Sequence, residues 1–78
     1  MTIDDEIDAI GLLCPLPVLK ARKRLKSLHS GQVLCVLADD PAAVIDMPHY
    51  CYEADHTLVS SELATPGALV RRYIIRKG

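Results

Sequence analysis

Two prolines, Pro15 and Pro17, most constrain how this chain folds, because they directly precede a segment with helical periodicity. Proline has a fixed φ angle and no amide hydrogen, so it suits the first turn of a helix and is disfavoured further inside one. Apolar residues then recur at three- and four-residue steps, the pattern of a helix with one buried face. They are Val18, Ala21, Leu25 and Leu28. We therefore predict that Cys14 is an N-cap, that Pro15 is the first helical residue, and that Ser30 and Gly31 end the helix.

Strand-like segments lie on both sides of this helix. Ile3, Ile7 and Ala9, with acidic residues between them, predict a short first strand. Residues 33–38 form a continuous apolar run rich in branched side chains, which is typical of a buried strand. Two strands joined by a helical crossover are parallel, so residues 3–38 predict a βαβ unit.

A second helix and a hairpin complete the predicted order. Asp39, Asp40 and Pro41 repeat the signal for a helix start, through a capping carboxylate and a proline suited to the first turn. Val44, Ile45, Tyr50 and Cys51 then belong to the second helix. Pro48 lies inside it and predicts a break or kink near residues 46–47, so that the helix is two short pieces. Residues 57–64 and 68–77 predict two strands that form a hairpin across residues 65–67.

These elements predict an α/β two-layer sandwich in the order β-α-β-α-β-β. The sheet is mixed and four-stranded, and both helices cover one of its faces, because a chain of 78 residues has room for only two layers. The other face is then partly exposed. Residues 1–78 form a single domain, since we find no repeat or linker that would divide them.

Charge is distributed unevenly along the chain. The formal net charge is −1, yet residues 9–38 hold no acidic residue and have a formal charge of +5. The basic residues are Lys20, Arg22, Lys23, Arg24 and Lys26. One face of the protein is therefore expected to be basic. The first residues are acidic and no run of apolar residues could span a bilayer, so we expect a cytoplasmic protein.

Cys14 is the candidate for chemistry. A thiolate at an N-cap is stabilised by the positive end of the helix dipole, which predicts a lowered pKa for Cys14, and Lys20 and Arg22 add positive charge nearby. The two prolines stiffen the loop that presents the sulfur. All three histidines fall in later segments, so we expect a nucleophilic carrier and not a hydrolase with its own base. Cys35 and Cys51 are interpreted as core residues.

The segment around Cys14 resembles a known protein family. Gly11 followed by Cys14, Pro15, Leu16 and Pro17 matches the Cys-Pro-x-Pro signature of the TusA/SirA/YedF-like sulfur-carrier proteins. Residues 8–11, 39–41, 46–51 and 76–78 look closest to the TusA branch of that family. The resemblance covers nearly the whole chain. It implies two helices on a four-stranded mixed sheet, a fold also found in the C-terminal domain of translation initiation factor three.

The resemblance also implies a function. Cys14 would accept a sulfane sulfur as a persulfide from a cysteine desulfurase or rhodanese and relay it to an acceptor protein, by a sulfurtransferase-type reaction that needs no metal or other cofactor. Gly11, Pro15 and Pro17 would present the thiol. The neighbouring Lys20, Arg22, Lys23 and Arg24 would form a docking surface for the partners. The pathway implied is synthesis of 2-thiouridine in tRNA or related sulfur trafficking, such as molybdenum-cofactor synthesis or sulfur oxidation.

Two other functions remain open at this stage. A module that binds RNA or the ribosome through the basic first helix would not need Cys14, although few aromatic residues are available for base stacking and no direct contact with nucleic acid or membrane is expected. A thiol-disulfide redox protein would need Cys35 or Cys51 as a resolving cysteine close to Cys14 in space. The cysteines and histidines lack the spacing of a metal site.

Overall fold

The computed structural model describes residues 2–78. Within this range the elements are β1 (Asp5–Asp8), α1 (Leu16–Leu25), β2 (Val33–Ala38), α2 (Ala43–Glu53), β3 (Thr57–Leu63) and β4 (Arg71–Arg76). The predicted order is confirmed, and the second predicted strand has the predicted bounds. The hairpin strands are shorter than predicted, because β4 begins at Arg71 and the loop before it closes with a hydrogen bond from the Ala64 N–H to the Val70 carbonyl (2.9 Å).

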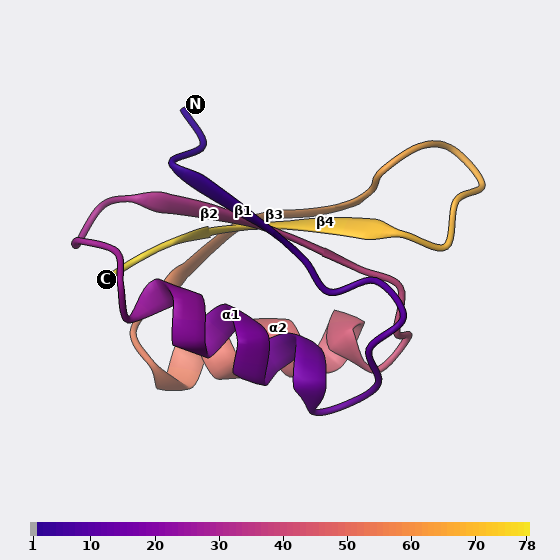
Figure 1. Cartoon of the computed structure of the whole chain (residues 1–78), viewed down its shortest axis with the longest axis horizontal. Coiled ribbons are helices and arrows are strands. Elements are labelled where there is room, and N and C mark those ends of the chain that lie inside the picture. The colour runs from indigo at the N-terminus through magenta and orange to yellow at the C-terminus, as the bar shows by residue number, and fades with distance from the viewer. Residues whose placement is uncertain (1) are drawn as a thin grey trace.

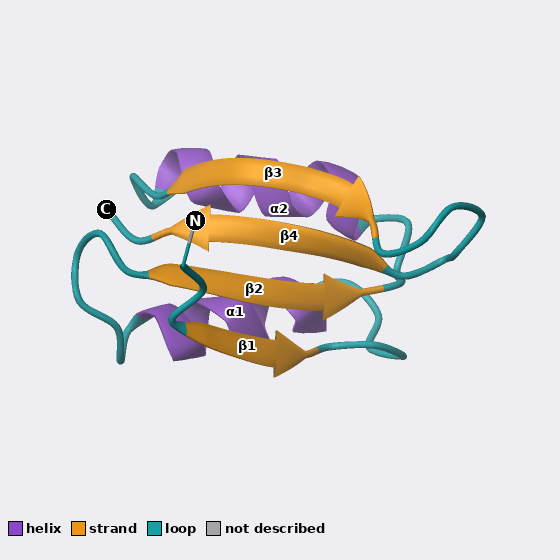
Figure 2. Ribbon diagram, turned by 90° about the horizontal axis from the view of Figure 1, so that it is seen from above, coloured by secondary structure: helices purple, strands orange, loops and turns teal. Residues whose placement is uncertain are grey.

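The four strands form one mixed sheet in the spatial order β1-β2-β4-β3. β1 pairs with β2 in parallel, whereas β4 is antiparallel to both β2 and β3. Both helices cover the same face of this sheet (Figure 1). Seen from above, α1 lies behind β1 and β2, and α2 lies behind β3 and β4 (Figure 2). The predicted two-layer α/β sandwich is therefore confirmed.

The main core lies between the sheet and the helices. Alternate residues of β2 point to opposite faces of the sheet, so Leu34 and Val36 face the helices, where Leu25 of α1 and Met47 of α2 pack against the same cluster. These side chains are at most 1% exposed. Burying a side chain of this size contributes roughly 1.5 to 3 kcal/mol relative to leaving it exposed. This burial fixes the two helices on the sheet and so sets where their N-terminal ends lie.

The open face of the sheet carries a smaller apolar cluster. Val33, Cys35 and Ile74 are buried there, with Leu37 and Val59 packed against them. Cys35 lies on this face, whereas Cys51 belongs to the main core on the helix side. Both thiols are buried, which confirms that the two cysteines are core residues.

The ends of α1 differ from the prediction. The helix begins at Leu16 with Pro15 as its N-cap, because the Pro15 carbonyl accepts the first helical hydrogen bond, from the Leu19 N–H (3.1 Å). Pro17 is then the second helical residue, and it is buried. α1 ends at Leu25, and turns continue the chain to Gly31, whose φ of +89° is readily adopted by glycine.

Pro48 does not divide the second helix, so the prediction of two short pieces is wrong. α2 runs from Ala43 to Glu53 with Pro48 inside it. The amide that proline lacks would have bonded to the Val44 carbonyl. Val44 lies on the exposed side of the helix with 45% of its surface accessible, so water can satisfy this carbonyl. The helix therefore tolerates the proline.

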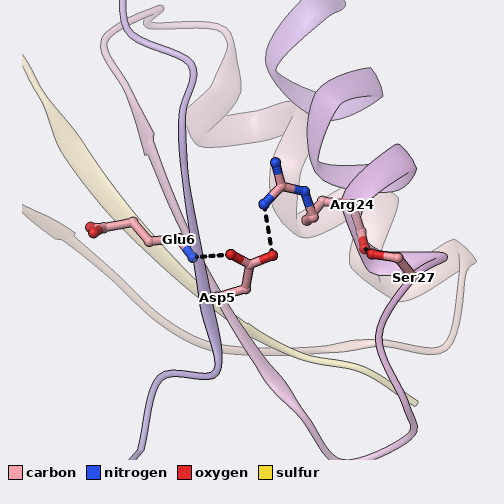
Figure 3. A network of polar contacts seen from close by, with 4 residues as sticks. All are labelled: Asp5, Glu6, Arg24 and Ser27. Carbon is pink, nitrogen blue, oxygen red and sulfur yellow. Dashed lines mark hydrogen bonds and ion pairs between the residues drawn. The ribbon is translucent and has the colours of Figure 1, made fainter.

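A polar contact also joins α1 to β1. The Arg24 guanidinium lies 2.7 Å from Asp5 Oδ2, and Asp5 Oδ1 accepts a hydrogen bond from the Glu6 N–H (Figure 3). The Ser27 hydroxyl donates to the Arg24 carbonyl just after the helix ends (Figure 3). The hydrogen bond from Arg24 holds the pKa of Asp5 below its usual value. Arg24 thus turns toward the edge strand.

Candidate functional site

Cys14 lies in the loop that connects β1 to α1, and two aspartates that follow β2 hold this loop. The Gly11 N–H donates to Asp39 Oδ1 (2.8 Å), and the Cys14 N–H donates to Asp40 Oδ2 (2.6 Å). Because β1 and β2 are parallel, their C-terminal ends lie at the same edge of the sheet, which brings the two loops together. Gly11 has a φ of +84°, a conformation that favours glycine.

Asp40 also organises the start of the second helix. Its Oδ1 accepts a hydrogen bond from the Ala42 N–H (3.2 Å), while its Oδ2 holds Cys14. The predicted turn role of Asp40 is matched by its contact to Ala42. The predicted capping role is wrong, because α2 begins at Ala43 with Ala42 as its N-cap and no side-chain cap. The contact of Asp40 to Cys14 could not be predicted from local patterns, because it spans 26 positions of the chain. One carboxylate thus couples the loop that bears Cys14 to the beginning of α2.

The thiol of Cys14 points to α2 and not into the amides of its own helix. Cys14 precedes the N-cap Pro15, so the prediction that Cys14 is the N-cap is wrong, and within residues 2–78 no side chain caps α1. The peptide bond between Cys14 and Pro15 is cis. Cys14 is exposed, and its Sγ donates a hydrogen bond to Asp46 Oδ2 (2.9 Å).

This contact reverses the expected electrostatics of the thiol. The hydrogen bond to Asp46 raises the pKa of Cys14, and desolvation and the negative charges of Asp46 and Asp40 act in the same direction. A carboxylate that accepts the thiol proton favours the neutral form over the thiolate. The lowered pKa predicted from the helix dipole is therefore wrong for the free protein.

A shallow hollow of about 340 Å³ opens beside the thiol. Its lining residues are Cys14, Pro15, Val18, Asp46, His49, Tyr50 and Glu53. His49 Nε2 lies 2.7 Å from Glu53 Oε1, so this histidine is held by a carboxylate one helical turn away. The expectation that every histidine lies away from Cys14 is therefore wrong for His49, which lines the same hollow. The positions 46, 49, 50 and 53 share one helical face, a spacing that signals a common surface.

The basic residues of α1 do not line this hollow. Lys20 donates from Nζ to the Asp8 carbonyl, and Arg24 pairs with Asp5. Arg22 lines a second hollow, of about 220 Å³, together with Lys26 and Lys77. Positions 20 and 24 therefore face the edge strand, whereas positions 22 and 26 face the other flank of the helix. The basic side chains expected near Cys14 are therefore not the charged groups beside it, and carboxylates stand there instead.

Two further features of the described chain bear on its chemistry. Among residues 2–78, no three side chains of histidine, cysteine, aspartate or glutamate come together in a way that could hold a metal ion. None of the helices in this range has the length and apolar character needed to cross a membrane. The candidate site thus consists of one exposed thiol, its carboxylate neighbours and the open hollow.

Comparisons with known proteins relate this chain to a protein family and to a solved structure. A family model described as "Sulfurtransferase TusA" matches residues 5–77. The crystal structure of a SirA-like protein from Desulfitobacterium hafniense superposes with a TM-score of 0.75. It is 29% identical to this chain, and the match covers 95% of this chain and 97% of the other. Both matches span nearly the whole chain and agree with the family resemblance of the segment around Cys14.

Proposed function

Because this chain belongs to the TusA sulfurtransferase family, whose model spans residues 5–77, we propose that Cys14 is the residue on which it carries sulfur. Membership makes the protein a sulfur carrier that relays sulfur between a donor and an acceptor protein. One observation carries the choice of residue: of the three cysteines, all in the described part of the chain, Cys14 is exposed and the other two are buried. Two sulfur atoms can exchange only when they touch, so the carrier thiol must be accessible.

The proposed reaction is a thiol exchange that conserves sulfur and electrons. The Cys14 thiolate attacks the terminal sulfur of a donor persulfide, and an S–S bond forms as the donor's own S–S bond breaks. The donor cysteine leaves as a thiolate and takes up one proton, which balances the proton that Cys14 loses. In the second exchange an acceptor thiolate attacks the terminal sulfur, and Cys14 is released. No external oxidant or reductant takes part.

The surface around the thiol supports contact with another protein. Leu13 and Leu16 flank the loop and are 68% and 49% exposed. Exposed apolar side chains beside a reactive group are suited to an interface, whereas isolated ones elsewhere have no such meaning. We propose a cysteine desulfurase or a rhodanese as the sulfur donor and a second thiol protein as the acceptor.

The basic residues of α1 are proposed as a docking surface next to this apolar rim. Lys20 and Arg24 already bond within the protein, whereas Arg22 and Lys23 are exposed. Arg22 and Lys23 are therefore the first pair to test. Charge reversal there should slow association with an acidic partner and weaken its salt dependence, because exposed charges act mainly on the rate of encounter.

The pathway proposed is sulfur delivery toward 2-thiouridine in tRNA, acting in the cytoplasm. Its support is the match of the TusA family model together with the signature around Cys14. The test is reconstitution of tRNA thiolation with and without the protein. Thiolated nucleoside that forms only when the protein is present, and not with Cys14→Ala, supports this pathway, and equal thiolation in all cases refutes it.

Intact-mass analysis tests the carrier function itself. The protein is incubated with a cysteine desulfurase, its coenzyme and cysteine, and wild type is compared with Cys14→Ala, Cys35→Ala and Cys51→Ala. We expect a reducible addition of about 32 Da that is absent only from Cys14→Ala. Cys35→Ala and Cys51→Ala are matched controls, because each removes one thiol of the same kind. Equal loading of all four proteins, or of none, would refute the proposal.

A further inference from the structure

The hydrogen bond between Cys14 and Asp46 joins two parts of the molecule that are held firmly. Asp46 lies in the first turn of α2, between Ala43 and Met47, both of which are buried in the main core. The loop of Cys14 is held by Asp39 and Asp40. The distance of 2.9 Å from Sγ to Asp46 Oδ2 is therefore set by anchored backbone on both sides.

The groups around the thiol are mainly acidic. α2 contributes Asp46 and Glu53, and its His49 is already paired with Glu53. The loop after β2 contributes the charge of Asp40. The helical residue that α1 contributes to the lining of the hollow is Val18, which is apolar. The described residues around Cys14 thus favour a protonated sulfur.

We propose that Asp46 restrains the reactivity of Cys14. Its carboxylate keeps the thiol protonated and weakly reactive in the free protein, and docking of a sulfur-exchange partner breaks this hydrogen bond. The inference rests on the proposed function, since it describes how the carrier thiol is controlled. The consequence is that Cys14 reacts selectively with docked partners. Small electrophiles in solution encounter a protonated thiol, whereas a docked partner encounters a thiol whose hydrogen bond to Asp46 is broken.

The physical basis is the dependence of thiol reactivity on ionisation. The thiolate is the nucleophile, so a group that favours the thiol slows every reaction of the free sulfur. For each pKa unit by which a thiol becomes more acidic, its thiolate fraction below the pKa rises about tenfold while its intrinsic nucleophilicity falls about threefold. Removal of the carboxylate should therefore give a net gain of about threefold for each such unit.

The experiment measures alkylation of Cys14 by iodoacetamide as a function of pH, quantified by mass. In this reaction the thiolate displaces iodide, an S–C bond replaces the C–I bond, and the thiol proton goes to the buffer. The variants are Asp46→Asn, which removes the charge with little change of shape, and Asp46→Glu, which retains a carboxylate. Glu62→Gln is the matched control, because it removes one negative charge from β3, opposite Arg72 on the open face of the sheet.

We expect the Asp46→Asn profile to move to lower pH, with several-fold faster alkylation at neutral pH. Asp46→Glu should stay closer to wild type, and Glu62→Gln should match it. A profile for Asp46→Asn that coincides with wild type, or that moves to higher pH, overturns the proposal. A merely structural role for Asp46 would not move the profile in this direction, and circular dichroism checks that each variant is folded.

Sulfur loading supplies the second readout. If a docked desulfurase already breaks the hydrogen bond, Asp46→Asn should load sulfur no faster than wild type in spite of its more reactive thiol. Loading that accelerates by the same factor as alkylation overturns the part of the proposal that concerns docking. Because alkylation needs no sulfur donor, the two ideas can fail separately: wild-type protein that takes no sulfur on Cys14 refutes the proposed function and leaves the alkylation profiles unaffected.

Discussion

Of the two aspartates that hold the loop of Cys14, Asp40 is the one that bonds to Cys14 itself, and its removal is the most direct test of how the site is built. The Asp40 carboxylate accepts hydrogen bonds from the backbone N–H groups of Cys14 (2.6 Å) and Ala42 (3.2 Å). Asp40→Ala leaves both donors without this partner. The loop of Cys14 and the start of α2 should then loosen together.

The magnitude follows from these two contacts. A hydrogen bond to a charged group contributes about 1.5 to 3 kcal/mol, and the lower end applies because Asp40 is only partly buried. The turn hydrogen bond from the Ala42 N–H is longer, at 3.2 Å, and its loss costs about 1 kcal/mol. Together these losses give roughly 2.5 kcal/mol for Asp40→Ala. That is a large part of the ~4 to 12 kcal/mol expected for a domain of this size.

Urea unfolding followed by circular dichroism measures this loss. With an m-value near ~1 kcal/mol per M, the midpoint of Asp40→Ala should fall by about 2.5 M. Asp40→Asn keeps one acceptor oxygen and should fall by about half as much. Amide exchange of Cys14 should also accelerate in Asp40→Ala, because its N–H loses its acceptor. A midpoint within about 0.3 M of wild type, with unchanged exchange at Cys14, would show that the carboxylate does not hold the loop.

Three further predictions concern the backbone, the thiols and the core. Gly11→Ala should lower the free energy of unfolding, measured by thermal unfolding, by about 1 to 2 kcal/mol, because φ is +84° at this position and the new Cβ would meet no atom within 4 Å. A larger or smaller loss would contradict this backbone conformation. Iodoacetamide at pH 8 should modify the native protein at Cys14 first and should reach Cys35 and Cys51 only after urea is added, because both are buried. Burial also raises the pKa of Cys51 to about 11, so this thiol is almost entirely protonated at pH 8. Rapid labelling of Cys51 in the native protein would disprove this prediction. Leu25→Ala should lower the free energy of unfolding by about 2 to 5 kcal/mol, because Leu25 is only 1% exposed. Leu19→Ala on the same helix should lower it far less, because Leu19 is 46% exposed. Equal losses would mean that the buried face of α1 is wrongly assigned.

Most of the fold could be predicted from local patterns. The apolar run at residues 33–38 predicts β2 with its observed bounds, and the stripe of Val18, Ala21 and Leu25 predicts the buried face of α1. These patterns work because a strand and a helix each repeat with a fixed period, which neighbouring residues in the sequence already display. Helix ends were less predictable: α1 starts one residue later than predicted, because the carbonyl of Pro15, and not that of Cys14, accepts the first helical bond.

The choice of Cys14 as the candidate residue also came from the sequence, through the two prolines and the position before a helix. The charged side chains that surround Cys14 in the folded protein could not be predicted in this way. The dipole and the basic residues of the helix that follows Cys14 both favour a thiolate. Local patterns therefore predict a lowered pKa for Cys14.

The tertiary structure decided the electrostatics of the site. Asp40 and Asp46 lie 26 and 32 positions after Cys14, and only the parallel pairing of β1 with β2 and the packing of α2 on the sheet bring them to it. The carboxylate that accepts the thiol hydrogen bond at 2.9 Å favours the neutral thiol, and Cys14 does not cap the helix whose dipole would favour the thiolate. The sequence by itself thus determined the elements, their order and the candidate thiol, whereas chain folding determined which charges face that thiol, because electrostatic effects depend on distance in space and not on separation along the chain.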